Sequence, residues 1–209
     1  MAHKLLYPVM VVLFATGCNN DPKKPVAEQL KNDSTLAPVS KLNKDSLLSA
    51  TGRHILTDLK NKQYDSLTRY FAPSDRVHFA PYGSIGSGVQ TLSAADFTTL
   101  LPGNKEIYWG DYDGSGDSIN LTVKQYLEKF VYNADFLNAE KIAVDSFIGA
   151  GNSLNNLKQY YPNARFIEYY FSGFNKKYEG MDWACLRLVF KEMEGKYYLV
   201  AIVHDQWTI

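Results

Sequence analysis

Three side chains of different chemistry, those of Cys185, Arg187 and His204, lie near the carboxyl end of the chain. They fall on two predicted strands that Glu194-Gly195 joins, a dipeptide typical of a two-residue hairpin turn. With that turn Cys185 lies opposite His204, and because side chains alternate across a strand, all three share one face of the sheet. Trp183 lies at the far end of that face. The sequence therefore predicts a cluster of a thiol, a guanidinium and an imidazole, with an indole beside it.

A cluster of this composition suits two kinds of site. The guanidinium and the imidazole can bind an anionic ligand, or the thiol and the imidazole can act as nucleophile and general base. We predict Trp183, Cys185, Arg187 and His204 as ligand-binding residues and assign no catalytic residue. The same residues also have a structural interpretation, in which Arg187 pairs with Glu168 and the other side chains are inert. A bulged turn would send the cluster to opposite faces.

A second candidate site is an acidic, glycine-rich loop. Asp111, Asp113 and Asp117 are separated by glycines in the segment DYDGSGD. Closely spaced carboxylates on a chain that can curl are ligands that a hard cation such as calcium prefers. The spacing is not that of an EF-hand, and Asp-Gly and Ser-Gly also form ordinary turns. The loop is predicted either as a metal site or as a plain turn, and no organic cofactor is predicted.

Hydrophobic periodicity and turn signals predict the elements that carry these residues. Helices are expected at 45–61, 63–71, 94–101, 123–132 and 153–160, with a loop over 109–121. Strands are expected at 77–82, 142–148, 164–171, 183–191 and 197–206. The first strand is expected at a sheet edge, because Pro81 cannot donate a ladder hydrogen bond. The last two strands are apolar on both faces, which predicts a central position in the sheet.

The order of these elements, with helices first and a long antiparallel meander last, resembles the nuclear transport factor-like α+β cone. SnoaL-type polyketide cyclases and ketosteroid isomerases share that fold. The resemblance covers residues 45–209 and implies a single α+β domain, with helices packed on a curved, mainly antiparallel sheet that lines a pocket. The segments WGDYDGSGD, GNSLNN, GMDWACLRLVF and HDQWTI also resemble an uncharacterised bacterial lipoprotein family.

Residues 1–17 have the layout of a secretory signal peptide, with a positive start, an apolar run over 5–14 and small residues at the end. The run is shorter than the roughly 20 apolar residues that a membrane span needs. With Gly17 before Cys18 the segment resembles the lipobox of bacterial lipoproteins, although Ala15 stands where Leu is usual. The resemblance implies cleavage before Cys18 and attachment of acyl chains such as palmitate to it. The polar residues 18–44 are predicted to form a flexible, disordered tether.

The charge balance argues against a nucleic-acid partner. The 209 residues include 22 Lys and Arg against 22 Asp and Glu, so the formal net charge is zero. Nucleic-acid binding depends on cations that neutralise phosphates. Aromatic residues make up 14% of the chain, which favours half-buried sheet surfaces and ligand-lining walls. A lipid on Cys18 leaves Cys185 as a single thiol, so we expect no disulfide framework.

The sequence leaves three functions open. The first is a membrane-anchored lipoprotein of the cell envelope that binds a small ligand in a sheet-lined cavity, in either the inner or the outer membrane. The second is an enzyme of the hydrolase or isomerase type that uses the same cavity with His204. The third is a protein-interaction module, with a homodimer as one form, that uses an open face of the sheet.

Overall fold

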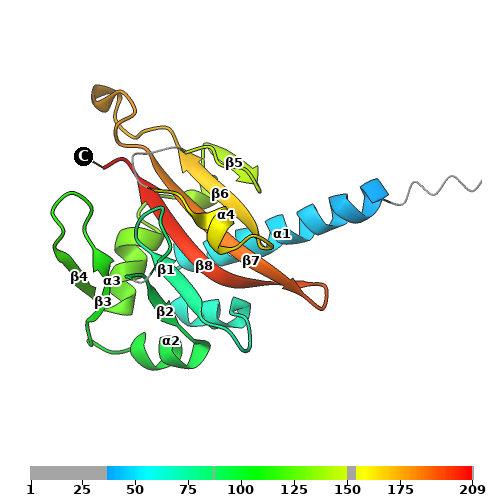
Figure 1. The fold of residues 1–209 in the computed structure, drawn as a ribbon, viewed down its shortest axis with the longest axis horizontal. Helices are drawn as coiled ribbons and strands as arrows, with labels where there is room; N and C mark the ends of the chain where they lie inside the picture. Colours follow the sequence, from blue (N-terminus) through cyan, green and yellow to red (C-terminus); the bar gives the residue numbers. More distant parts are fainter. Residues whose placement is uncertain (1–36, 87, 150–153, 209) are drawn as a thin grey trace, which may run out of the picture. The chain divides into compact units, whose positions relative to one another are not determined.

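A six-stranded mixed sheet forms the centre of the protein, in a computed structural model that describes residues 37–86, 88–149 and 154–208, with side chains from residue 43 onward. The strand order is β2 (Gln90–Leu92), β1 (Val77–Ala80), β8 (Lys196–Gln206), β7 (Ala184–Met193), β6 (Arg165–Phe171) and β5 (Lys141–Val144). Strands β1 and β8 are parallel, and the other neighbours are antiparallel. The predicted α+β class with a mainly antiparallel sheet is confirmed (Figure 1).

The remaining elements surround this sheet. The helices are α1 (Ala37–Lys60), α2 (Ala94–Leu100), α3 (Val123–Tyr126) continued by a π-turn over Leu127–Val131, and α4 (Leu157–Tyr160). Short 3₁₀ turns lie at Tyr64–Tyr70, Phe136–Asn138 and Lys176–Tyr178, and β3 (Ile107–Asp111) pairs with β4 (Ser118–Leu121) in a separate hairpin. Within the described part of the chain, no helix is both long and apolar enough to cross a membrane.

The sheet has a thick and a thin covering layer. One face packs against α1, α2 and α3 in a core rich in aromatic rings, to which β7 contributes Ala184, Leu186, Leu188 and Phe190. The opposite face is covered by a smaller group around α4, to which β7 contributes Val189. This alternation follows from the pleat of a strand, which points successive side chains to opposite faces. Helices α1 and α4 therefore lie on opposite sides of the sheet (Figure 1).

The hairpin of β7 and β8 has the predicted turn but not the predicted register. Glu194 and Gly195 have φ angles of 52° and 75°, which is the backbone of a type I′ turn. Near the turn the pairing is as expected, but the register shifts by one between Val189 and Phe190. Val200 is the extra residue of this bulge, because Val189 pairs with Ala201 while Phe190 pairs with Leu199.

The bulge corrects the predicted cluster. Beyond it, Cys185 pairs with Asp205, and His204 pairs with Leu186. Paired residues share a face, so His204 lies on the side of the aromatic core, whereas Cys185 and Arg187 lie on the other side. The expectation of a hairpin without a bulge was wrong, and it failed because a bulge inside a strand leaves no turn signal in the sequence.

The structure differs from the sequence-based prediction at three further places. Strand β1 lies between β2 and β8 rather than at an edge, since it ends at Ala80, before Pro81. The segment expected as a loop over 109–121 contributes to the β3–β4 hairpin. Helix α1 begins at Ala37, so the last part of the predicted tether is helical. Residues 1–36, with the signal segment and Cys18, lie outside the described residues.

Two predicted helix starts are confirmed in detail. The Ser93 hydroxyl accepts a hydrogen bond from the Asp96 backbone, and the Asp96 carboxylate accepts one from the Ser93 backbone. Thr122 and Gln125 form the same reciprocal pair at the start of α3. Each pair satisfies two N–H groups that the first turn of a helix leaves without partners.

Gly52 allows α1 to approach β6 closely, and this contact gives a first prediction. A Cβ at this position would lie 2.7 Å from Ile167 Cδ1 and would also clash with the Tyr169 hydroxyl. We expect Gly52→Ala to lower the free energy of unfolding by about 1–3 kcal/mol, although Ala is the better helix former. Urea denaturation measures the change.

The matched control is Gly86→Ala, because a Cβ on Gly86 meets no atom within 4 Å. If both substitutions changed the unfolding free energy equally, the close packing of α1 on β6 would be contradicted.

Candidate functional site

Arg187 lies at the centre of a buried ion network rather than in a binding cavity. Its side chain has no exposed surface, and Nε donates to Glu168 Oε2 at 2.6 Å. One terminal nitrogen donates to Asp205 Oδ2 at 3.1 Å, and the other donates to the Gly149 carbonyl at 3.3 Å. The guanidinium also lies 5.2 Å from the centre of the Phe147 ring. The pairing of Arg187 with Glu168, one of the two interpretations of the sequence, is present.

The network fixes the segment that follows β5 onto the sheet. Glu168 Oε1 accepts hydrogen bonds from the backbone N–H groups of Ile148 and Gly149, at 2.8 and 2.6 Å. Asp145, at the start of the segment, accepts two hydrogen bonds from Arg165. Buried charges are tolerated where such partners replace water. The arrangement indicates a structural role for these charged side chains.

Cys185 and Trp183 take part in the same buried region. Cys185 is fully buried, and burial raises the pKa of its thiol well above the usual range. A thiol that stays protonated is a poor nucleophile. Trp183 is also buried, and its ring centre lies 6.1 Å from that of Tyr170. Trp183, Cys185, Arg187 and His204 line none of the five hollows found among the described residues near residues 72–75, α1, Tyr64 and Tyr160.

His204 lies on the opposite face and is fully hydrogen-bonded. Nδ1 lies 2.8 Å from the Pro81 carbonyl, and Nε2 lies 3.2 Å from Nδ2 of Asn133. A carbonyl only accepts and an amide nitrogen only donates, so the neutral ring with its proton on Nδ1 satisfies both contacts. Burial lowers the pKa of His204 to about 4. This imidazole holds the end of β8 against Pro81, and both of its ring nitrogens have hydrogen-bond partners.

The three aspartates of the glycine-rich loop are not gathered into a cluster of metal ligands in the structure. In the residues described here, no group of three or more His, Cys, Asp or Glu side chains is arranged to hold a metal ion. Asp111 instead accepts hydrogen bonds from Tyr108 and Ser118 within the β3–β4 hairpin. The alternative reading as a plain turn fits, because Gly114 and Gly116 adopt positive φ angles that favour glycine.

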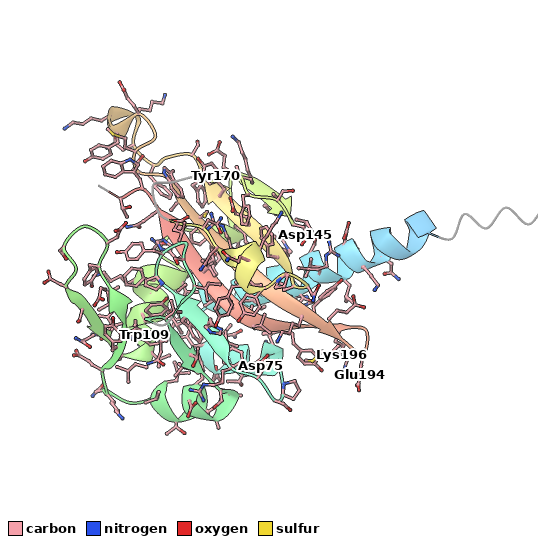
Figure 2. The ribbon with its side chains drawn as sticks, viewed as in Figure 1. Asp75, Trp109, Asp145, Tyr170, Glu194 and Lys196 are labelled. Atoms are coloured by element: carbon pink, nitrogen blue, oxygen red, sulfur yellow. The ribbon has the colours of Figure 1, made fainter. Side chains whose placement is uncertain are left out.

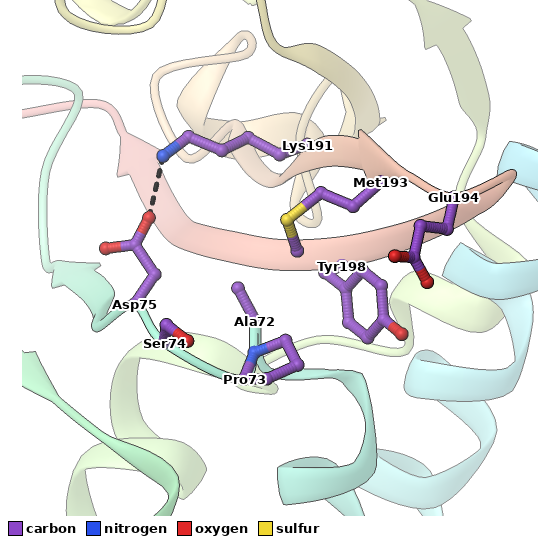
Figure 3. A pocket seen from close by; sticks show the side chains of 8 residues that line it. All are labelled: Ala72, Pro73, Ser74, Asp75, Lys191, Met193, Glu194 and Tyr198. Carbon is purple, nitrogen blue, oxygen red and sulfur yellow. Dashed lines mark hydrogen bonds and ion pairs between the residues drawn. The ribbon is translucent and has the colours of Figure 1, made fainter.

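A pocket of about 300 Å³ lies between residues 72–75 and the β7–β8 hairpin (Figure 3). Its apolar walls are formed by Ala72, Pro73, Met193 and Tyr198. Charged side chains bound it on two sides. Lys191 and Asp75 form an ion pair of 2.7 Å on one side, and Glu194 lies at the hairpin tip on the other (Figure 3). Figure 2 shows where Asp75 and Glu194 lie in the fold.

A second groove of about 430 Å³ adjoins this pocket, because Lys191 and Met193 line both. Tyr160 and Tyr161 form part of its wall. Together the two hollows offer tyrosine rings, a thioether and charged groups on the thinly covered side of the hairpin. These are features of small-molecule sites, which combine an apolar lining with a few polar groups.

His78 lies beside this groove and contacts both of its tyrosines. Nδ1 lies 2.6 Å from the Tyr161 hydroxyl, and Nε2 lies 3.3 Å from that of Tyr160. The Tyr161 hydroxyl also donates to the carbonyl of Val200, the bulge residue. Burial lowers the pKa of His78, which favours the neutral form of its ring. The imidazole orients the two tyrosine rings of the groove.

This pocket was not predicted from the sequence, in which Glu194-Gly195 indicates only a turn. Lys191 and Met193 alternate on β7 beyond the buried stretch, and that alternation marks one face of the hairpin end. The residues of the 72–75 segment carry no comparable signal, because only the tertiary fold brings them to the hairpin.

Comparisons with known proteins assign no family to this chain. No family model matches the sequence, and a search of the curated proteins finds no match. Among solved structures, the crystal structure of a DUF4783 family protein from Bacteroides ovatus is matched with 11% sequence identity and a TM-score of 0.30. The match covers 74% of this chain and 94% of that one. Values this low assign neither a fold family nor an activity.

The buried His204 gives a prediction for the pH dependence of stability. Its pKa of about 4 in the folded protein lies below the ordinary value of 6.5. The unfolded chain therefore binds a proton that the folded chain does not, and stability is lost as the pH falls from about 6.5 to 4. The loss due to this residue is about 3 kcal/mol.

Urea denaturation at a series of pH values tests this, with His204→Gln compared to the unchanged chain. We expect His204→Gln to be less stable at pH 7 and to lose most of the slope between pH 4 and 6.5. His54→Gln is the control, because His54 is exposed on α1. An unchanged slope in His204→Gln would show that the pKa of this imidazole is the same in the folded and the unfolded protein, and would contradict its lowering by burial.

Proposed function

We propose that this chain is a membrane-anchored bacterial lipoprotein of the cell envelope whose α+β domain binds a small ligand. The site is the pocket between residues 72–75 and the β7–β8 hairpin, together with the adjoining groove. The observation that carries this proposal is the pocket itself, which combines an apolar wall from Met193 and Tyr198 with the Lys191–Asp75 ion pair. Ligand sites commonly have volumes of about 300–1,000 Å³ and a lining of this kind.

The side chains that catalysis would need are buried or already hydrogen-bonded, which favours binding over catalysis. In the cluster predicted from the sequence, the Cys185 thiol is buried with a raised pKa, and both ring nitrogens of His204 have hydrogen-bond partners. A nucleophile needs a reachable thiolate, and a general base needs a free lone pair within about 3 Å of its substrate. An enzyme that uses His204 has no support in this arrangement, so binding is the function that we propose.

The membrane anchor in this proposal rests on the sequence alone. The apolar run over 5–14 and the small residues before Cys18 support export and acylation at Cys18. Two or more acyl chains give stable attachment, whereas a single chain binds a bilayer only weakly. The polar residues after Cys18 would let the domain reach ligands away from the bilayer surface.

Acylation at Cys18 is tested in a bacterial host fed with labelled palmitate. We expect the unchanged chain to carry label and to sediment with membranes, and Cys18→Ser to lose both, because the thioether bond needs the thiol. Cys185→Ser is the matched control and should retain the label, since Cys185 is buried in β7. A labelled Cys18→Ser chain, or an unlabelled and freely secreted parent chain, would contradict the anchor.

Ligand binding at the pocket is tested by NMR with a library of small fragments on the unlipidated mature chain carrying Cys18→Ser. We expect some fragments to shift the signals of the Met193 methyl group and the Tyr198 ring. Ser74→Trp should weaken those fragments at least about tenfold, because Ser74 is exposed and lines the pocket, so an indole there fills it.

Ser115→Trp is the control, because Ser115 is exposed in the turn between β3 and β4 and does not line the pocket. Fragments that shift no signal of the pocket, or that bind Ser74→Trp as well as the parent chain, would overturn the proposed site.

A further inference from the structure

Glu194 occupies a backbone position that does not favour glutamate. Its φ of 52° lies in the left-handed region, at the first central position of the type I′ turn. Asn, Asp and Gly are preferred there, because other L-residues bring Cβ too close to the backbone. A glutamate thus costs stability at this position, and its long side chain places a carboxylate at the rim of the pocket, beside Tyr198 (Figure 3).

Two lysines of this region are already paired, and Lys196, which follows the turn, does not line the pocket. Lys191 contacts Asp75 at 2.7 Å, and Lys44 contacts Glu192 at 2.9 Å. In the described part of the chain, Glu194 has neither an ion-pair partner nor a hydrogen-bond partner for its carboxylate. The pocket lining therefore holds two carboxylates against one ammonium group, which leaves it with a net negative charge. A negative lining attracts cations and repels carboxylate or phosphate ligands.

The uncharged wall of the pocket suits a cation as well. Tyr198 presents an aromatic ring, and the ring face of tyrosine attracts ammonium groups. Met193 adds a polarizable thioether, which adapts to apolar groups of irregular shape. Tyr160 and Tyr161 continue this aromatic lining into the adjoining groove. An ammonium group surrounded by methyl or methylene groups can contact a ring and a carboxylate at the same time.

We propose that the ligand of this pocket is an organic cation, an ammonium or trimethylammonium group on an apolar stem, with Glu194 as its counter-ion and Tyr198 as its aromatic contact. This inference rests on the proposed ligand-binding function and adds the chemical class of the ligand. The left-handed backbone of Glu194 lowers the stability of the folded protein, and the same position keeps the carboxylate at the rim of the pocket.

Matched pairs of probes test the charge requirement. Choline and butylammonium are titrated into the unlipidated mature chain by NMR, alongside their neutral counterparts 3,3-dimethylbutan-1-ol and butan-1-ol. We expect the cations to shift the Tyr198 and Met193 signals and to bind at least about fivefold more tightly than the neutral compounds. Equal affinity of the two members of a pair overturns the cation proposal and leaves the pocket as a binding site.

Variants of Glu194 separate charge from shape. Glu194→Gln keeps the size of the side chain and should weaken choline about two- to fivefold. Glu194→Asn should weaken it similarly while raising Tm by about 2 °C, because Asn tolerates the left-handed region better. Glu179→Asn is the matched control, since Glu179 has a φ of 51° but lies after the Lys176–Tyr178 turn, outside the pocket. It should raise Tm and leave choline binding unchanged.

The aromatic contact has its own pair of variants. Tyr198→Leu should weaken choline about three- to thirtyfold, whereas Tyr198→Phe keeps the ring and should retain binding. Unchanged affinity in Glu194→Gln and Tyr198→Leu overturns the proposal. If neither cation shifts the pocket signals while neutral or anionic fragments do, the cation class is wrong and the binding function stands. If no compound of any charge binds there, both proposals fail.

Discussion

An extra residue, Val200, is inserted into β8 opposite Val189, and this bulge decides which side of the sheet each polar side chain of the hairpin occupies. The two strands form the centre of the sheet, so a shift of one residue exchanges the two covered faces for every residue of β8 beyond it. With the bulge, Arg187 and Asp205 lie on the thinly covered face and His204 lies on the side of the aromatic core. The carbonyl of Val200 also accepts a hydrogen bond from Tyr161, which ties the bulge to the groove wall.

The buried charges follow from that placement. Arg187 and Glu168 are neighbours on β7 and β6, and Asp205 joins them from β8. Charges removed from water need partners at close range, and Glu168 uses its remaining oxygen to hold the backbone of the segment after β5. Removing one partner would leave the others buried without compensation. The network therefore constrains the sheet and its covering segment together, which is a structural task rather than a catalytic one.

The pocket lies where this covering layer ends. Toward the turn the hairpin extends past the core, and the face that buries Arg187 at one end presents Lys191 and Met193 at the other. Residues 72–75 lie beside it because the chain enters β1 there, next to β8. The same hairpin thus supplies a rigid, buried anchor at one end and a partly open surface at the other. A site on paired strands is held more precisely than a site on loops alone.

The sequence by itself determined the α+β class, the helix starts at Ser93 and Thr122, the turn at Glu194-Gly195 and the identity of the central strands. These features depend on local periodicity, capping and turn chemistry, which a short segment carries within itself. The sequence also offered the pairing of Arg187 with Glu168 as one of two interpretations, and the structure contains this pair. Only the tertiary structure decided the register beyond Val200, the interior position of β1 and the meeting of Asp75 with Lys191. Each of these depends on contacts between residues far apart in the chain, and a bulge changes them without any local signal.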